Sequence, residues 1–431
     1  MSYKLYTHEL LIKNPQEILK NRVLRVDSSG KIEDFSEPPA PDKHRPLPKI
    51  LIPGLINLHT HLVYTDLKIG EKKLFYWLKD LVEKIYKIPQ MEDEKTANIN
   101  EFKLSESYLA GCRESLALGT TFVVDNTSHP ELALSAFLET GLQGIIGLEV
   151  FGSDPDQAQE IFAETLKKLR ALETQAGSEL AGFALAEFAL APHATYDVSS
   201  ELWGLCVDHA KKHKKIILSH LSESADEEAW FRDKDSAESR SAREFWASIN
   251  TLDSKLKNWK PYRSATEFLA TNKLLGENLL LAHACYIDNE DLDLLARSKT
   301  RLVTCPRSNA YLKNQKARTE LWQKNNLLFG VGTDSKASNH SLDLRQEANQ
   351  LSELSARDRF ELISSRAAQV LNKQNLIGTL EPGKNADWVE LEVLDSSVNL
   401  DLADPFELVM DTKITRVKQV YISGKLKYEA G

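Results

Sequence analysis

Hydrophobic and polar positions alternate differently at the two ends of the chain and in its middle. Short β-like pieces separated by turns occupy the first fifty residues (3–11 and 22–26) and the last fifty (386–393 and 417–430). Such pieces, bounded by turn residues, are typical of strands in hairpins or meanders. The pattern therefore predicts small β structures at both ends of the chain.

The middle of the chain, from about residue 51 to 380, alternates apolar runs with longer amphipathic segments. The strand-like runs are 50–58, 120–126, 143–150, 182–191, 215–220, 279–283, 300–305 and 328–333. Helix-like segments, such as 105–119, 156–172 and 199–213, lie between them. Eight strands, each followed by a helix, are what a (β/α)8 barrel requires. Residues 223–265 are too long for a simple strand-to-helix loop, so we expect a helical insertion over the barrel mouth. The sequence leaves open whether it is a lid, a dimer contact or neither.

Charge and cysteine content narrow the class of protein. The chain of 431 residues has a net charge of −9, which argues against a nucleic-acid or anionic-membrane partner. Its four cysteines are scattered and form no CxxC motif, as expected of buried or free thiols in a reducing compartment. We see no signal peptide and no apolar run of about 18–20 residues. These features predict a cytoplasmic protein.

Histidines stand close together after the first barrel strand. The stretch PGLINLHTHLVYTDL (53–67) contains His59 and His61 with one residue between them. Alternate side chains of a strand point to the same face, so two imidazoles at this spacing could share one metal ion. By itself an HxH pair is also common by chance or as a structural feature. The interpretation therefore needs further ligands.

Those ligands occur at the ends of three more predicted strands. His220, His283 and Asp334 each end one, and Glu223 follows His220 by three residues. Functional residues of a barrel lie at the carboxyl ends of its strands, and three imidazoles with a carboxylate suit Zn²⁺ or Fe²⁺ with one position left for water. Singly, His220 is more often a hydrogen-bonded structural histidine, Asp334 could cap a helix, and Glu223 could be solvated surface. Only the joint arrangement is specific.

The motifs resemble those of a known superfamily. HTH (59–61), SHLSE (219–223), AHACY (282–286), CPRSN (305–309) and GTDS (332–335) are similar to motifs of the amidohydrolase superfamily, above all of its ATZ/TRZ-type aminohydrolases. This group includes S-adenosylhomocysteine/methylthioadenosine, guanine, cytosine and aminodeoxyfutalosine deaminases. The resemblance covers nearly the whole chain. It implies a distorted (β/α)8 TIM barrel over residues 51–383 and a small β-sandwich composed of residues 1–50 and 384–431.

The resemblance also implies roles for individual residues. The metal ligands would be His59, His61, His220 and Asp334, with Asp334 also accepting a proton from the attacking water. Glu223 would shuttle protons, and His283 would polarise the attacked centre or orient the water. Two-metal relatives use a carboxylated lysine on strand four. Here strand four, within residues 180–193, contains no lysine, which favours a single ion, Zn²⁺ before Fe²⁺.

Substrate contacts are implied less sharply. His193 in APHATY would face the substrate, although a capping or buried histidine is the alternative. Arg307 would reach a substrate carboxylate bidentately or form a surface ion pair, with equal weight for the two. Tyr64 agrees with the pattern of aminodeoxyfutalosine deaminases, whereas Val63 stands where those sequences often carry a glutamate. Ser308 and Asn309, also in CPRSN, are expected to shape their loop.

The sequence thus predicts a metal-dependent hydrolase that deaminates a purine-like or other N-heterocyclic amine, with aminodeoxyfutalosine as one candidate. The alternatives are hydrolysis of a cyclic amide, C–N or C–Cl bond in another heterocycle and, with less weight, a non-catalytic binding protein on the same fold. The expected partner is a small heterocyclic substrate. Many relatives are homodimers, but no feature of the sequence demonstrates an interface.

Overall fold

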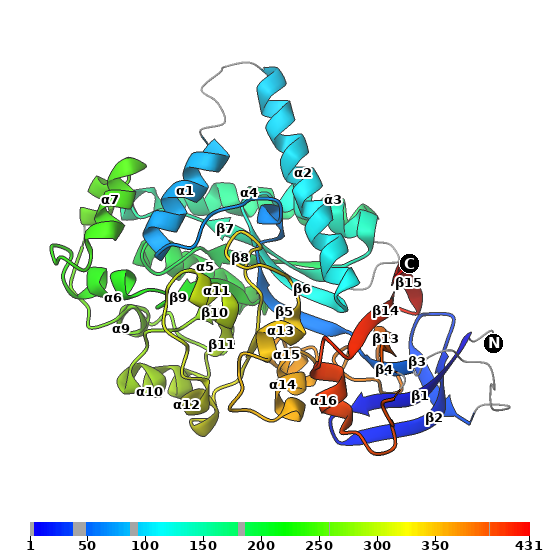
Figure 1. The fold of residues 1–431 in the computed structure, drawn as a ribbon. Coiled ribbons are helices and arrows are strands. Elements are labelled where there is room, and N and C mark those ends of the chain that lie inside the picture. Colours follow the sequence, from blue (N-terminus) through cyan, green and yellow to red (C-terminus); the bar gives the residue numbers. More distant parts are fainter. Residues whose placement is uncertain (1–3, 38–48, 87–93, 180–185, 258, 396) are drawn as a thin grey trace.

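Strands from both ends of the chain form one mixed sheet (Figure 1). The computed structural model describes residues 4–37, 49–86, 94–179, 186–257, 259–395 and 397–431. The sheet has the order β15-β14-β13-β4-β1-β2-β3. Its strands are Lys4–Asn14 (β1), Glu17–Val26 (β2), Ile32–Ser36 (β3), Lys49–Pro53 (β4), Trp388–Val393 (β13), Thr415–Ile422 (β14) and Lys425–Glu429 (β15). Only β1 and β4 pair in parallel.

This terminal sheet curls around a small core of its own. The Ala386 amide donates to Gly30 O at 3.0 Å, and the Gly424 amide donates to Ala386 O at 2.8 Å. These bonds join the β2–β3 loop to the β14–β15 turn. Leu11 and Trp388 are among the buried residues inside. The union of both chain ends in one small β unit is as predicted, while the domain limits 1–50 with 384–431 and 51–383 stay a prediction.

Eight parallel strands form the second sheet, which closes into a distorted barrel. In spatial order they are Leu55–Thr60 (β5), Thr120–Thr127 (β6), Gln143–Val150 (β7), Ala186–Pro192 (β8), Ile217–Leu221 (β9), Leu279–His283 (β10), Arg301–Thr304 (β11) and Phe329–Val331 (β12). The amides of Thr333 and Asp334 both donate to His59 O, at 3.1 and 3.0 Å, and join the end of β12 to β5. The predicted fold class is confirmed.

One predicted strand is in fact two. Residues 50–58 were expected to form a single strand, but β4 ends at Pro53 in the terminal sheet and β5 begins at Leu55 in the barrel. Gly54 makes the switch where the backbone passes against Thr121, because a Cβ at Gly54 would lie 2.1 Å from the Thr121 hydroxyl oxygen. Of the predicted strand 182–191, residues 182–185 lie outside the described part of the chain.

Helices cover the barrel and its mouth (Figure 1). They are Leu74–Tyr86 (α1), Glu94–Ala117 (α2), Pro130–Thr140 (α3), Ala158–Glu179 (α4), Ser200–His213 (α5), Ala225–Arg232 (α6), Arg240–Ser248 (α7), Leu252–Leu256 (α8), Ala265–Thr271 (α9), Asn289–Ser298 (α10), Pro306–Tyr311 (α11), Thr319–Lys324 (α12), Leu344–Ala348 (α13), Ala356–Leu362 (α14), Ser365–Val370 (α15) and Pro405–Met410 (α16), with short 3-10 turns at Leu62–Tyr64 and Pro155–Gln157. The insertion, residues 223–265, contains α6, α7 and α8. Phe75 of α1 packs edge-on against Trp246 of α7, with ring centres 5.4 Å apart.

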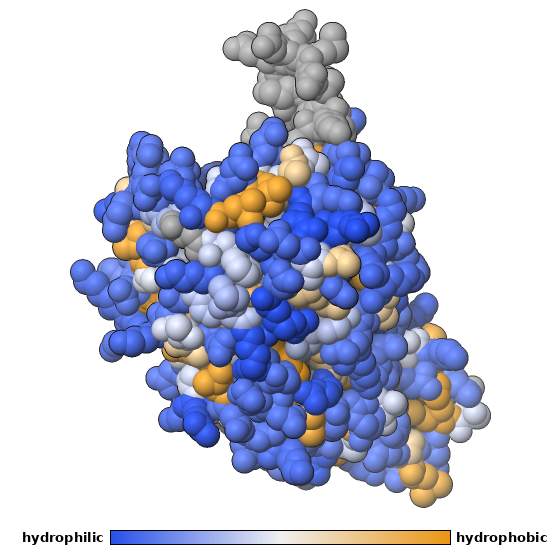
Figure 2. Space-filling view, turned by 90° about the vertical axis from the view of Figure 1, so that its left-hand side faces the viewer, coloured by the Kyte–Doolittle hydropathy of each residue, from blue (hydrophilic) through white to orange (hydrophobic). Residues whose placement is uncertain are grey.

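The face of the molecule that Figure 2 shows is mostly hydrophilic. On the face in Figure 2, hydrophobic areas are small and separated by hydrophilic side chains. Among the described residues, no helix combines the length and the apolar character that a membrane crossing demands. The four cysteines are all free and buried, as Cys112, Cys206, Cys285 and Cys305 were expected to be.

Candidate metal centre and active site

The predicted ligands come together at the carboxyl ends of the barrel strands. His59 lies in β5, His61 directly after it, His220 in β9, His283 at the end of β10 and Asp334 three residues after β12. All five side chains are buried. Donor atoms of His59, His220 and His283 lie within 4.8 Å of one another, and so do those of His59, His61 and Asp334. Residues far apart in the sequence therefore form one cluster.

The distances in this cluster suit a divalent metal ion. Nε2 of His61 lies 3.3 Å from Nε2 of His220. Oδ1 of Asp334 lies 3.7 Å from Nε2 of both His59 and His61. Two nitrogen ligands about 2.0–2.1 Å from a tetrahedral Zn²⁺ are themselves about 3.3–3.4 Å apart. Nε2 of His59 is buried and has no hydrogen-bond partner among the described residues. Such an atom is available to bind a metal ion.

Hydrogen bonds fix which nitrogen His220 and His283 turn toward the cluster. Nδ1 of His220 donates to His193 O at 2.6 Å, and Nδ1 of His283 lies 2.8 Å from Oδ1 of Asn309. Nε2 of each ring is then left with its lone pair facing the centre. Burial lowers the pKa of His59, His220 and His283 below the usual value. The rings are therefore neutral, the form that binds a metal.

Two serine hydroxyls orient the carboxylate of Asp334. Oγ of Ser308 and Oγ of Ser338 donate to its Oδ2, at 2.6 and 2.7 Å. Burial would raise the pKa of Asp334, but the neighbouring His61 and His59 lower it below the usual value. The group is thus a carboxylate whose Oδ1 faces the imidazoles. It does not cap a helix, because Asp343 occupies the N-cap of α13.

Some of the non-glycine residues that have a positive φ lie at these strand ends. Ser222, His283, Ala284 and Asp334 have φ values of 47°, 72°, 46° and 56°. Residues other than glycine seldom adopt this left-handed region, and it is enriched at functional sites. His283 and Asp334, which have these φ values, both belong to the cluster.

Glu223 is a buried acid beside the cluster, not solvated surface. Its Oε2 lies 3.8 Å from Nε2 of His283. The loop that carries it is held by Glu227, whose carboxylate accepts the amides of Ser222 at 3.1 Å and Glu223 at 2.7 Å. Burial, with the nearby charges of Asp334 and Glu227, raises the pKa of Glu223 well above the usual value. Burial therefore favours the protonated form of Glu223 over its carboxylate.

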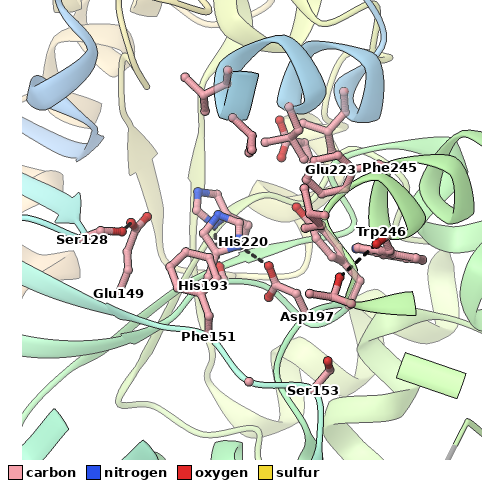
Figure 3. A pocket seen from close by; sticks show the side chains of 18 of the residues that line it. Ser128, Glu149, Phe151, Ser153, His193, Asp197, His220, Glu223, Phe245 and Trp246 are labelled. Carbon is pink, nitrogen blue, oxygen red and sulfur yellow. Dashed lines mark hydrogen bonds and ion pairs between the residues drawn. The ribbon is translucent and has the colours of Figure 1, made fainter. Parts of the chain in front are cut away.

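A cavity of about 500 Å³ opens beside the cluster (Figure 3). Apolar side chains of α1, including Trp77 and Leu81, form part of its wall. Phe245 and Trp246 of α7 and Lys255 of α8 form another part, so the insertion lies over the mouth of the barrel. The cavity is large enough for a nucleoside-sized ligand.

Two of the three predicted substrate contacts line this cavity. Tyr64 stacks on His61, with ring centres 6.0 Å apart. Nδ1 of His193 lies 2.6 Å from Oδ2 of Asp197. Burial lowers the pKa of His193, but Asp197 outweighs this effect and raises it to about 9. His193 is therefore a charged donor at neutral pH.

Arg307 is placed differently. It is not among the residues that line the cavity. Its amide donates to Oε2 of the buried Glu347 at 3.0 Å, and its Nε lies 4.0 Å from Oε1 of the same carboxylate. The geometry gives Arg307 an ion-pair role and offers no support for a substrate contact.

Sequence reasoning missed several residues of the cavity wall. Asp197 fixes His193, Phe151 stacks on the His193 ring at 4.7 Å, and Glu149 lies 3.5 Å from Nδ1 of His61. In Figure 3, Glu149 lies on one side of the labelled histidines and Trp246 on the other. The carboxyl end of β7, which carries Glu149 and Phe151, was the signal that could have identified two of them.

Comparisons with known proteins agree with this geometry. The model of the amidohydrolase family matches residues 50–427. The 5-methylthioadenosine/S-adenosylhomocysteine deaminase of Symbiobacterium thermophilum is 25% identical over 399 residues, which are 88% of this chain and 81% of that protein. An adenosine deaminase from Xanthomonas campestris with bound zinc has a similar fold, with a TM-score of 0.74, 21% identity and coverage of 98% and 92% of the two chains. The Helicobacter pylori aminofutalosine deaminase in complex with methylthio-coformycin also has a similar fold. Its TM-score is 0.73 at 20% identity, and the match covers 98% of this chain and 99% of that one.

Proposed function

This chain belongs to the amidohydrolase family, and from this premise we propose that it hydrolytically deaminates a purine-like or other N-heterocyclic amine, with aminodeoxyfutalosine as one candidate. The observation that carries the proposal is the cluster of histidine and aspartate side chains beside a buried acid, Glu223, whose pKa is raised by burial. The relative from Symbiobacterium thermophilum, a deaminase of adenosine-type compounds by name, supports it.

The metal would be held by His59, His61, His220 and Asp334. We propose one zinc ion, because their histidine and carboxylate donors suit it and strand four contributes no lysine to bridge a second. A bound divalent metal lowers the pKa of its water toward neutrality. The preference for zinc over iron comes from the sequence analysis, and we keep it in this proposal.

The chain's own groups then move protons and position the substrate. Asp334 accepts a proton from the attacking water. Glu223 gives its proton to the ring nitrogen of the substrate and then helps the amine to leave as ammonia. His283, 3.8 Å from Glu223, faces the attacking oxygen. The charged His193 donates a hydrogen bond into the cavity, where the substrate lies.

Ammonia release from the metal-loaded enzyme tests the proposal. The panel is adenosine, S-adenosylhomocysteine, methylthioadenosine, guanine, cytosine and aminodeoxyfutalosine, with the metal content assayed alongside. Ammonia from one compound, with about one metal ion per chain, is the expected result. Bound metal without ammonia from any compound would contradict it and favour hydrolysis of a cyclic amide, C–N or C–Cl bond. A chain that binds these compounds without converting them would be a binding protein.

We also propose that the enzyme acts in the cytoplasm. The scattered cysteines support this location, since all four are free thiols. A homodimer stays a prediction, which size-exclusion chromatography with light scattering tests.

A further inference from the structure

A lysine ammonium is buried in the wall of the cavity. Lys255 of α8 exposes 9% of its surface. Its Nζ donates to Tyr196 O at 3.1 Å and lies 4.8 Å from the centre of the Trp246 ring. An ammonium group has three N–H donors, yet within the described residues this one has a single hydrogen-bond acceptor and no carboxylate within 4.0 Å. A buried charge without an opposite charge beside it is unfavourable.

Asp197 is the acidic residue whose charge acts on Lys255, and it already has hydrogen-bond partners. Its carboxylate is hydrogen-bonded to His193 and to the Ala194 amide. Lys255 also lines the cavity in which the proposed substrate lies. An anionic group of a ligand would therefore find an ammonium with unused donors.

A continuous row of rings leads from the metal cluster to this lysine. The ring of His193 lies 4.8 Å from that of His220, and Tyr196 lies 6.2 Å from His193. Trp246 follows at 6.0 Å from Tyr196, with Nζ of Lys255 over its face. A substrate whose reacting ring lies at the cluster would extend its other end along Tyr196 and Trp246.

We propose that Lys255 binds a carboxylate of the substrate, so that the enzyme selects a heterocyclic amine with an apolar or aromatic arm that ends in a carboxylate. This inference rests on the proposed function, because it places the reacting ring at the metal cluster. The apolar side chains of α1 and the ring of Trp246 suit the arm, and the ammonium suits its end.

A carboxylate fits this position better than a phosphate. In the described part of the chain, Lys255 is the one lysine or arginine that lines the cavity. Five acidic residues line it as well: Glu149, Asp154, Asp197, Glu223 and Asp334. The ammonium of Lys255 balances one negative charge. The charged His193, which also lines the cavity, already pairs with Asp197. A phosphate dianion would need more positive charge than Lys255 supplies.

The test compares aminodeoxyfutalosine with its methyl ester, which lacks the negative charge. The wild-type enzyme should have a kcat/KM at least 10-fold higher for the acid than for the ester. Lys255→Met should bring the two values within 3-fold, mainly through a higher KM for the acid. Lys257→Met is the matched control, because that lysine is exposed two residues away and pairs with Asp154 and Asp156. It should keep the wild-type ratio.

Calorimetric binding of both probes to the zinc-loaded proteins separates this inference from the proposed function. Absence of ammonia from both probes would refute deamination of this compound. The carboxylate site would still be supported if the wild type binds the acid more tightly than the ester and Lys255→Met abolishes this difference. Equal affinity for acid and ester in the wild type, or binding of neither, would overturn the inference. Tighter binding of adenosine monophosphate than of aminodeoxyfutalosine would overturn it too, in favour of phosphate. If Lys255→Met does not fold, the wild-type ratio and Lys255→Gln decide.

Discussion

Asn309 sets the orientation of His283: its Oδ1 lies 2.8 Å from Nδ1 of the imidazole. The hydrogen bond places the proton of the neutral ring on Nδ1 and leaves Nε2 to face the cluster and Glu223. Asn309 was expected to shape the CPRSN loop. The structure gives it a more specific task, because it decides which nitrogen of His283 is available to the reaction.

Replacement of Asn309 should therefore impair turnover more than binding. We expect Asn309→Ala to lower kcat about 10- to 100-fold, since His283 can then rotate or change its tautomer. Metal content and Tm should change little. The control is the exposed Asn325→Ala, whose side-chain amide donates to Leu321 O of α12. Steady-state kinetics measure this effect. An unchanged kcat in Asn309→Ala would show that turnover does not depend on the hydrogen bond from His283 to Asn309.

The two serines at Asp334 should govern metal affinity. Both hydroxyls donate to Oδ2 and keep Oδ1 turned toward the histidines. A Ser308→Ala, Ser338→Ala double variant should bind zinc about 10- to 100-fold more weakly, as measured by competition with a chelator. The exposed Ser29→Ala, in the terminal sheet, should bind zinc as the wild type does. Equal affinity in the double variant would show that Asp334 needs no such support.

Glu223→Gln should separate metal binding from catalysis. The change keeps the size of the side chain but replaces an acid, whose pKa burial raises, with a group that cannot transfer a proton in this way. We expect kcat to fall about 10²- to 10⁴-fold, with the metal retained, because proton transfer contributes factors of this size. The exposed Glu238→Gln serves as control. Loss of metal from Glu223→Gln, measured by elemental analysis, would make Glu223 a ligand instead.

Much of the site could be predicted because its candidate residues lie in short motifs at strand ends. His59, His61, His220, His283 and Asp334 each follow an apolar run, and the barrel alone brings such positions to one rim. Contacts between distant segments carry no such local signal. Lys255 lies in a charged stretch that indicates solvated surface, yet α8 packs it beneath Trp246. Likewise, nothing in the run 50–58 reveals that Gly54 passes against Thr121 and divides the strand.

Arg307 illustrates the same limit and gives a prediction. Its sequence context left a substrate carboxylate and an ion pair equally open, and the structure places it against Glu347, which is fully buried. Arg307→Met should lower the free energy of unfolding by about 1–3 kcal/mol, because it removes the guanidinium that lies 4.0 Å from this buried carboxyl group. KM should not change. A KM raised tenfold at unchanged Tm would instead assign Arg307 to the substrate.

Asp125 links the first metal-binding motif to the stability of the barrel. Its Oδ1 accepts the amide of Leu62, directly after His61, at 2.8 Å, and Tyr108 donates its hydroxyl to Oδ2. Burial raises the pKa of Asp125 from 3.8 to about 7. Between these two pH values the folded protein binds more protons at this site than the unfolded chain does. Stability must then fall as pH rises through this range.

Asp125→Asn should remove that dependence, because asparagine still accepts the Leu62 amide but carries no titrating proton. Between pH 5 and pH 8, the wild type should lose up to about 3 kcal/mol more than the variant, at about 1.4 kcal/mol for each unit of pKa shift. Denaturant unfolding at both pH values measures this, with the exposed Asp401→Asn as control. Parallel pH profiles for Asp125→Asn and the wild type would show that Asp125 is ionised in the folded protein, so that the bond from Tyr108 would have to stabilise a buried charge.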